Sequence, residues 1–339
     1  MIVTFGETML RLSPPGHRRF LQVDSFDCWY GGAESNCAVA LAQMGTPARV
    51  VTVLPDNPLG QGCRNELRRW GVDVDFIRMD SSPGARLGLY FCENGVAQRP
   101  SQVVYDRANS SFSCSKPEDY DWNVILQGAK WFHFTGITPA LGALGENLRG
   151  AVQKACQTAK EFGVQISCDL NYRSALWSRE EASRTMKEYL PYVDLLIANG
   201  GSAYDVLGMG PGFCSAHPLE DAASTAKEIA ALYKIPRVAM TVRTSHSASR
   251  NGWQAILCEG KKVYISKSYE LEIEERIGGG DSFAAGLLDG LYRGKDPQYC
   301  VELAAAVSCL KHTVPGDAHI LSRAEAEGLI ESDTIMPRR

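Results

Sequence analysis

Residues 276–286 read RIGGGDSFAAG, a run of three glycines followed by an acid. Apolar residues at intervals of three and four, from Phe283 to Leu291, predict a helix that begins at this acid. Glycines allow backbone N–H groups to turn toward one point, and a helix N-terminus adds unpaired N–H groups and a partial positive charge. We therefore predict an anion site suited to phosphate.

Asp281 is unusual at such a site, because a carboxylate directed at phosphate would repel it. A carboxylate directed at a substrate hydroxyl would instead accept its proton while phosphate is transferred. A plain helix N-cap is an equal alternative on the local sequence alone, since Asp and Gly are both favoured there. The role of Asp281 therefore depends on the rest of the chain.

The composition is that of an ordinary globular protein without a strongly charged surface. The chain has 339 residues, of which 45% are hydrophobic, and 35 basic against 39 acidic residues give a net charge of −4. This balance argues against partners such as nucleic acids or anionic membranes. No apolar run approaches the roughly 20 residues of a membrane helix. Residues 2–6 are typical of a strand and not of a signal peptide.

The chain has eleven cysteines, an odd number, and no Cys-x-x-Cys pair. Most of them fall in apolar periodic stretches, as Cys37, Cys156, Cys300 and Cys309 do. Buried free thiols in a reducing compartment explain this pattern better than disulfides or zinc. We therefore expect a cytoplasmic protein whose cysteines have no catalytic or metal-binding role.

Alternating strand and helix patterns predict an α/β fold. Repeated β–α units imply a doubly wound, mostly parallel sheet with helices on both faces. The predicted strands are 1–6, 48–54, 72–78, 129–135, 164–169, 193–199, 238–242, 253–258 and 261–266. The predicted helices are 37–45, 58–70, 143–162, 179–190, 219–234, 281–292, 297–312 and 322–330.

Residues 10–32 and 86–110 do not fit this alternation. Residues 87–93 and 101–106 are predicted strands that follow each other without a crossover helix, and residues 10–32 are typical of short strands joined by turns. We therefore predict a small antiparallel sheet that is inserted in a single domain of residues 1–339 and stands off it.

Polar side chains follow several predicted strands, at the edge where open α/β sheets bind ligands. Asp169, Asn171 and Arg173 follow one apolar strand, and together they suit a phosphorylated or acidic ligand. The strand ends at Asn199 and at 241–243 are weaker signals, because each could be ordinary loop chemistry.

Two further groups of residues are candidates for a binding site. Tyr90, Tyr105 and Arg107 belong to the predicted small sheet. Alternating aromatic residues are more often sheet packing than a binding face, but an Arg after such a strand is harder to explain as packing. Gly32 is either a plain turn or a place where a sugar approaches the backbone, with Asn36 facing the same place one helical turn later.

These motifs, in this order, resemble the ribokinase-like (PfkB) carbohydrate kinase family. Residues 31–36 resemble the family's N-terminal sugar motif, and residues 277–286 resemble its C-terminal signature. The match covers nearly the whole chain. Within the family, residues 105–108, 169–177 and 312–317 most resemble the 2-keto-3-deoxygluconate kinases.

The resemblance implies an ATP-dependent kinase of a sugar acid, 2-keto-3-deoxygluconate above all, with Mg²⁺ bound together with ATP. The catalytic residues would be the base Asp281 and an anion hole of N–H groups from Gly278, Gly279 and Gly280. The sugar acid would be held by Gly32, Asn36, Tyr90, Tyr105, Arg107, Arg173 and Asp317. The nucleotide would lie near Asn199, Thr241, Arg243, Gly278 and Gly280. The small sheet would be a lid that pairs to form a homodimer or a larger homo-oligomer.

Two positions depart from the family pattern. Ser202 stands where relatives often have Glu, so the residues that position Mg²⁺ are not identified. Arg243 stands where many relatives have Gly, and it could itself supply charge for phosphate. The alternatives are a kinase of a neutral sugar such as fructose, a kinase of another dehydro sugar acid, and a sugar-acid binding protein without activity. A dehydrogenase is disfavoured, because no Gly-x-Gly-x-x-Gly follows the first strand.

Overall fold

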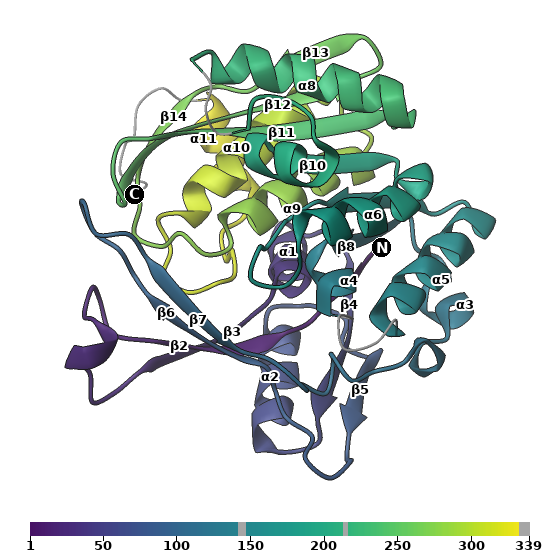
Figure 1. Ribbon diagram of the computed structural model, residues 1–339, viewed down its shortest axis with the longest axis vertical. Helices are drawn as coiled ribbons and strands as arrows, with labels where there is room; N and C mark the ends of the chain where they lie inside the picture. The colour runs from purple at the N-terminus through teal and green to yellow at the C-terminus, as the bar shows by residue number, and fades with distance from the viewer. Residues whose placement is uncertain (142–146, 213–215, 332–339) are drawn as a thin grey trace.

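The computed structural model describes residues 1–141, 147–212 and 216–331. It confirms an α/β fold in which helices cover both faces of one large sheet (Figure 1). Within the described residues this sheet has ten strands in the order β13-β12-β11-β10-β9-β8-β1-β4-β5, and β14 pairs with β12. The strands from β11 to β5 in this order are parallel, whereas β12, β13 and β14 pair in antiparallel fashion.

Most predicted elements are present with small shifts at their ends. The strands of the large sheet are β1 (Ile2–Phe5), β4 (Ala48–Pro55), β5 (Ile77–Asp80), β8 (Trp131–Thr135), β9 (Gln165–Asp169), β10 (Leu195–Asn199), β11 (Arg237–Ser245), β12 (Arg250–Glu259), β13 (Lys262–Ile265) and β14 (Tyr269–Glu272). The longer helices are α1 (Ala33–Gln43), α2 (Pro58–Arg69), α5 (Asn147–Glu161), α6 (Arg179–Tyr189), α8 (Pro218–Tyr233), α9 (Gly279–Tyr292), α10 (Pro297–Lys311) and α11 (Arg323–Glu331). Short helical turns are α3 (Trp122–Ile125), α4 (Ile137–Ala140) and α7 (Gly200–Ser202), which continues as a π-helical turn, Ala203–Leu207. The helix start predicted at residue 143 and the domain end at 332–339 lie outside the described residues.

Two hydrophobic cores lie on opposite faces of the large sheet. Side chains of α5, α6 and α8 form one core with the sheet, and those of α1, α2, α9, α10 and α11 form the other. Successive side chains of β1 alternate between them, because neighbouring residues of a strand point to opposite faces. Val3 and Phe5 join the first core, and Ile2 joins the second. Among the described residues, no helix has both the length and the apolar character needed to cross a membrane.

The small sheet contains β2 (Met9–Ser13), β3 (Asp27–Gly31), β6 (Leu89–Glu93) and β7 (Gln102–Asp106), and it stands apart from the large sheet in Figure 1. Its order is β3-β2-β6-β7. The outer pairs are antiparallel, as expected, while the central pair of β2 and β6 is parallel. The reason is that β2 follows β1 and β6 follows β5, and these two strands of the large sheet run in the same direction.

Two boundaries differ from the expectation, each for a physical reason. The helix expected from Cys37 already begins at Ala33. The intervening polar residues Glu34, Ser35 and Asn36 hid its start, since they are buried without apolar periodicity. The strand expected at 72–78 is only β5, because the apolar residues before it are buried in the core without strand pairing beyond a single bridge.

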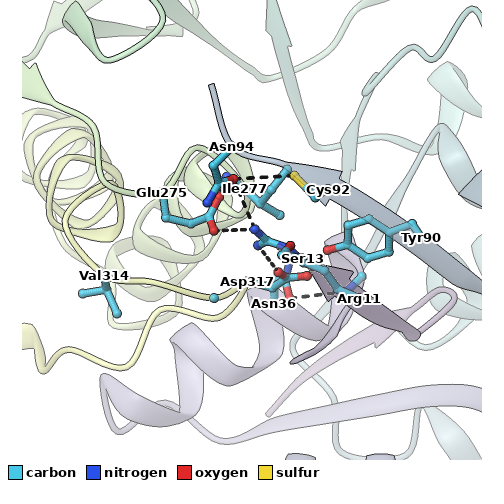
Figure 2. Close-up of polar contacts among 12 residues, drawn as sticks. Arg11, Ser13, Asn36, Tyr90, Cys92, Asn94, Glu275, Ile277, Val314 and Asp317 are labelled. Carbon is cyan, nitrogen blue, oxygen red and sulfur yellow. Dashed lines mark hydrogen bonds and ion pairs between the residues drawn. The ribbon is translucent and has the colours of Figure 1, made fainter. Parts of the chain in front are cut away.

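A buried ionic network joins the small sheet to the large domain (Figure 2). Arg11 of β2 forms ion pairs of 2.7 Å with Asp317 and 2.6 Å with Glu275, and all three side chains are buried. The hydroxyl group of Tyr90 on β6 also donates to Asp317. Removing one partner from a buried ion pair is strongly destabilising. The network therefore fixes β2 and β6 against the segments that precede α9 and follow α10.

Candidate active site

A cavity of about 580 Å³ opens at the carboxyl ends of the parallel strands. Asp169 from the end of β9, Asn199 from the end of β10 and Thr241 from β11 line it. The first turn of α9 and the small sheet complete its walls. An open α/β sheet binds ligands at this edge, so the cavity is the candidate site.

The glycine run forms the start of α9, and the surroundings of its three glycines differ. Gly278 has a φ of 82°, a left-handed conformation, and a Cβ atom there would collide with the carbonyl oxygen of Asp317. A Cβ atom on Gly279 would lie 2.5 Å from the His312 ring. Gly280 has no atom within 4 Å of its Cβ position. The first two glycines therefore permit close packing, and the third leaves space open beside the cavity.

Asp281 lies in the first turn of α9, with its side chain half-buried. The helix N-cap is Gly278, so the alternative that Asp281 is the N-cap is wrong. The side-chain amide of Asn36 donates to its carboxylate at 2.8 Å. Burial raises the pKa of Asp281 to about 6, although the Asn36 hydrogen bond and the charge of Arg173 oppose the shift. Asp281 is thus held in one orientation and remains mostly ionised at neutral pH.

Asp169 is a further carboxyl group close to Asp281, and Glu34 lies close to Asp169. Glu34 accepts a hydrogen bond from the Thr135 N–H at 2.9 Å, and Asp169 accepts one from the Asn171 N–H at 2.9 Å. Burial raises the pKa of each acid to about 7, and repulsion from Asp281 contributes to the shift at Asp169. Bringing these carboxyl groups together is unfavourable unless a proton or a cation compensates their charge.

These acids fit the requirements of Mg²⁺. Within residues 1–141, 147–212 and 216–331, no three His, Cys, Asp or Glu side chains form a complete metal site. Mg²⁺ commonly needs only one or two protein carboxylates, because the phosphates of its nucleotide and water supply the other ligands. Asp169 and Asp281 would be candidates to hold such an ion, because both line the cavity.

Arginines provide positive charge elsewhere in the lining. Arg243 packs over the Trp253 ring at 5.3 Å and lies near Arg276. Burial, with a smaller effect from Arg276, lowers the pKa of Arg243 to about 10. Among the described residues, neither Arg243 nor Arg173 has an ion pair with an acid. Guanidinium groups that face a cavity in this way favour an anionic ligand.

The small sheet contributes two tyrosines and an arginine to the cavity. Tyr90 and Tyr105 lie opposite each other on β6 and β7, and their rings stack with centroids 5.9 Å apart. Arg107 is not free, because its Nε donates to the Glu7 carboxylate at 2.8 Å. The hydroxyl group of Ser110 also donates to Glu7. The charge of Arg107 is therefore paired within the protein itself.

The structure brings all predicted site residues to this cavity except Asp317. Asp317 is buried behind Tyr90 and paired with Arg11, so its carboxylate holds Tyr90 and does not line the cavity. Asn199 accepts a hydrogen bond from the Ser202 N–H at 2.9 Å, and the Ser202 hydroxyl accepts one from the Asn199 N–H at 3.0 Å. Ser202 thus completes the N-terminal cap of α7 at the position where the family pattern often has Glu.

The sequence did not predict several lining residues, among them Glu7, Glu34 and Arg276. Glu7 follows β1 by two residues, and the strand-end argument used for Asp169 would have found it. Glu34 lies on a helix, where an acid is usually exposed, so its burial has no local signal. Arg276 precedes the glycine run, but the direction in which its side chain points depends on the fold.

A glycine turn, an ionised acid and unpaired arginines around one cavity are typical of phosphoryl transfer. The chain belongs to the pfkB family of carbohydrate kinases, whose family model matches residues 1–323.

Individual relatives agree with this family. The chain is 35% identical to a 2-dehydro-3-deoxygalactonokinase of Haloferax volcanii over 97% of this chain and 96% of that protein. It is 29% identical to a 2-dehydro-3-deoxygluconokinase of Thermoproteus tenax, over 98% and 94% of the two chains. The crystal structure of a 2-dehydro-3-deoxygluconokinase from Thermotoga maritima has 49% identity and a TM-score of 0.92, with 98% of each chain covered. The predicted family and fold are thereby confirmed.

Proposed function

We propose that this chain is an ATP-dependent kinase that phosphorylates the terminal hydroxyl group of 2-keto-3-deoxygluconate, giving the 6-phosphate. The observation that carries the proposal is the position of Asp281. Its carboxylate lies at the start of α9, beside the glycine turn, in a cavity that arginines from four parts of the chain also line. The relatives named after 2-dehydro-3-deoxygluconate, the same acid, and after its galacto epimer support the choice of substrate.

The proposed mechanism assigns proton transfer to Asp281. Its carboxylate accepts the proton of the attacking hydroxyl, and a pKa of about 6 suits a general base near neutral pH. Asn36 fixes its orientation by hydrogen bonding. The N–H groups at the start of α9 stabilise the charge of the transferred phosphoryl group. Mg²⁺ bound with ATP would neutralise charge on the β- and γ-phosphates.

The arginines that line the cavity would bind two different ligands. Arg243 and Arg276 would face the phosphates of ATP near Thr241 and Asn199. Arg173 is exposed to the cavity, and its charge reaches Asp281 and Asp169. Arg173, together with Arg107, would bind the carboxylate of the sugar acid, because a planar guanidinium can donate two parallel hydrogen bonds to it.

A neutral-sugar kinase is the second candidate, and one observation favours it. Glu7 already neutralises Arg107, so Arg107 offers less attraction for an acid than a free guanidinium would. A kinase of another dehydro sugar acid is a related alternative, since it would use the same arginines.

The test is a kinase assay with ATP and Mg²⁺ across sugar acids and neutral sugars. We expect 2-keto-3-deoxygluconate to exceed fructose and ribose by about 10–100-fold in kcat/KM, the value of one charge-assisted hydrogen bond. A preference for a neutral hexose would replace the proposal by the second candidate. Binding of the acid without transfer of labelled phosphate from ATP would indicate a binding protein instead.

The small sheet is proposed to be a lid that excludes water after the sugar binds. A second copy of the chain is proposed to cover its outer face. Leu12, Phe91 and Val104 lie next to each other in register on this face, opposite to the face that carries Tyr90 and Tyr105. The cysteines in the described ranges are free thiols, which supports the proposal of a cytoplasmic location.

A further inference from the structure

Lys311, the last residue of α10, has a fully buried side chain that the proposed mechanism does not use. Its ammonium group donates to the carbonyl oxygens of Val314 at 3.0 Å and Gly316 at 2.9 Å. Within the described part of the chain, no carboxylate forms an ion pair with it. Burying an ammonium group costs free energy even when it is hydrogen-bonded, so its presence here requires a compensating role.

Its position relates it to the glycine turn. The Cε atom of Lys311 lies 3.1 Å from the place that a Cβ atom on Gly278 would take. The carbonyl oxygen of Asp317 approaches the same place, and the ring of His312 lies behind Gly279. Residues 311–317 thus form the back wall of the turn, and Lys311 ties the two ends of this segment together.

The charges around Lys311 show what its ammonium group balances. Glu275, Asp317, Arg11 and Asp281 are the charged groups that act on it. Arg11 and Lys311 together carry two positive charges, and Glu275 and Asp317 carry two negative ones. Burial lowers the pKa of Lys311 to about 8, and Glu275, Asp317 and Asp281 oppose this shift, so the group remains mostly protonated at neutral pH. Without Lys311 the cluster behind the turn would be negative and would repel phosphate.

We propose that Lys311 is a positioning residue for phosphoryl transfer. Its ammonium group holds residues 311–317 against Gly278 and cancels the negative charge directly behind the anion hole. Lys311 touches neither the sugar nor the nucleotide. The inference rests on the proposed function, in which this turn receives the γ-phosphate.

The first test compares Lys311→Met with Lys311→Arg. The Met side chain keeps most of the buried stem without its charge, and Arg keeps a charge on a different stem. We expect Lys311→Met to lower kcat by about 10²-fold, the cost of a slight misplacement of a catalytic group, with little change in the KM for the sugar. Lys311→Arg should recover part of the loss. The exposed Lys154 of α5 provides the matched control, and Lys154→Met should behave as wild type.

The second test asks whether the charge itself is required. Lys311→Ala removes the part of the side chain that propylammonium matches, so added propylammonium or ammonium should restore kcat, while equal sodium chloride should not. Thermal melting of each variant shows whether a loss of activity reflects a loss of folding. If Lys311→Ala does not fold, the kcat of Lys311→Met provides the test. Failure of both amines to restore any activity, or a kcat for Lys311→Met within about threefold of wild type, would overturn the proposal.

Measuring the binding of β,γ-imido-ATP and of ADP tests this inference independently of the proposed function. Lys311→Met should weaken the imido analogue more than ADP, because the lost charge acts on the γ-phosphate. Equal weakening of both nucleotides would count against Lys311 whether or not the sugar is turned over. If wild-type protein transfers no phosphate but the imido analogue is selectively weakened, the proposed function fails and the role of Lys311 at the anion hole stands.

Discussion

Asp281 combines two properties that a general base needs, a fixed orientation and a pKa near the working pH. Asn36 of α1 supplies the first through its hydrogen bond. Burial supplies the second by raising the pKa to about 6, and the same residue would be less basic if it were exposed. Asn36 on α1 and Asp281 on α9 are far apart in the sequence, so these properties of Asp281 arise from the fold.

Asp281→Asn should lower kcat by about 10²-fold or more, the range for loss of a general base. The fold should survive, because Asn has the same shape and removes a buried charge. The wild-type kcat should fall as the pH drops through about 6, since protonated Asp281 cannot accept a proton. Initial rates and melting curves across this range check both points. Near-normal turnover of the variant would remove Asp281 from the mechanism.

Glu7 forms an ion pair with Arg107, which is proposed to bind the carboxylate of the sugar acid. Glu7→Gln removes the charged partner but can still accept a hydrogen bond, so the guanidinium should turn more readily to a substrate carboxylate. We expect the KM for the sugar acid to fall by up to about tenfold, with little change for a neutral sugar. Arg107→Leu should have the opposite effect on the acid. If Glu7→Gln weakens both sugars equally, Glu7 instead binds a hydroxyl group that they share.

At the scale of elements, substitutions in the turn that begins α9 should distinguish effects on stability from effects on activity. Gly280→Ala should leave stability unchanged or raise it by about 0.5–1 kcal/mol, since Ala is the better helical residue. It should nevertheless lower kcat by about 10²-fold, because the methyl group occupies the open space where phosphate is expected.

Gly278→Ala is the comparison for this turn. Its left-handed φ and the nearby Asp317 carbonyl group should make it lose stability and activity together. Chemical denaturation and steady-state rates measure the two properties. Full activity of Gly280→Ala would show that phosphate does not approach this turn.

The sequence predicts elements well where periodicity reports burial. The strand patterns of β4, β8, β9 and β10 and the helical pattern of α9 all correspond to observed elements. Buried charge is not predictable in this way, because Arg11 in β2 and Lys311 at the end of α10 look locally like ordinary exposed residues although both are fully buried. Their partners lie far along the chain or in an irregular loop, and no local pattern encodes such contacts.

At the scale of the whole molecule, the site forms where three units meet. The large sheet provides strand ends, α9 provides the glycine turn, and the small sheet covers one side. The order of motifs along the chain predicts this assembly in outline, since strand ends converge at one edge of a parallel sheet. It could not predict that Asp317 lies behind Tyr90, because that position depends on the ionic network with Arg11.

The same small sheet leads to a prediction about assembly. Its inner face lines the cavity. On its outer face, Val104 is 46% exposed and lies beside Phe91 and Leu12 in register. An apolar sheet face in water is a favourable surface for association. We expect sedimentation to give about twice the chain mass of 37.1 kDa, as a symmetric dimer requires.

Val104→Lys should dissociate this dimer, because a charge would be buried at the contact without a partner. Val124→Lys is the matched control, since Val124 is 48% exposed on α3, outside the small sheet. The monomeric variant should also have a raised KM for the sugar, because the proposed lid would close less firmly without its neighbour. The pH dependence expected from Asp281 should remain. A dimer that survives Val104→Lys uses a different surface, and a monomeric wild type would leave the outer face of the small sheet without the proposed partner.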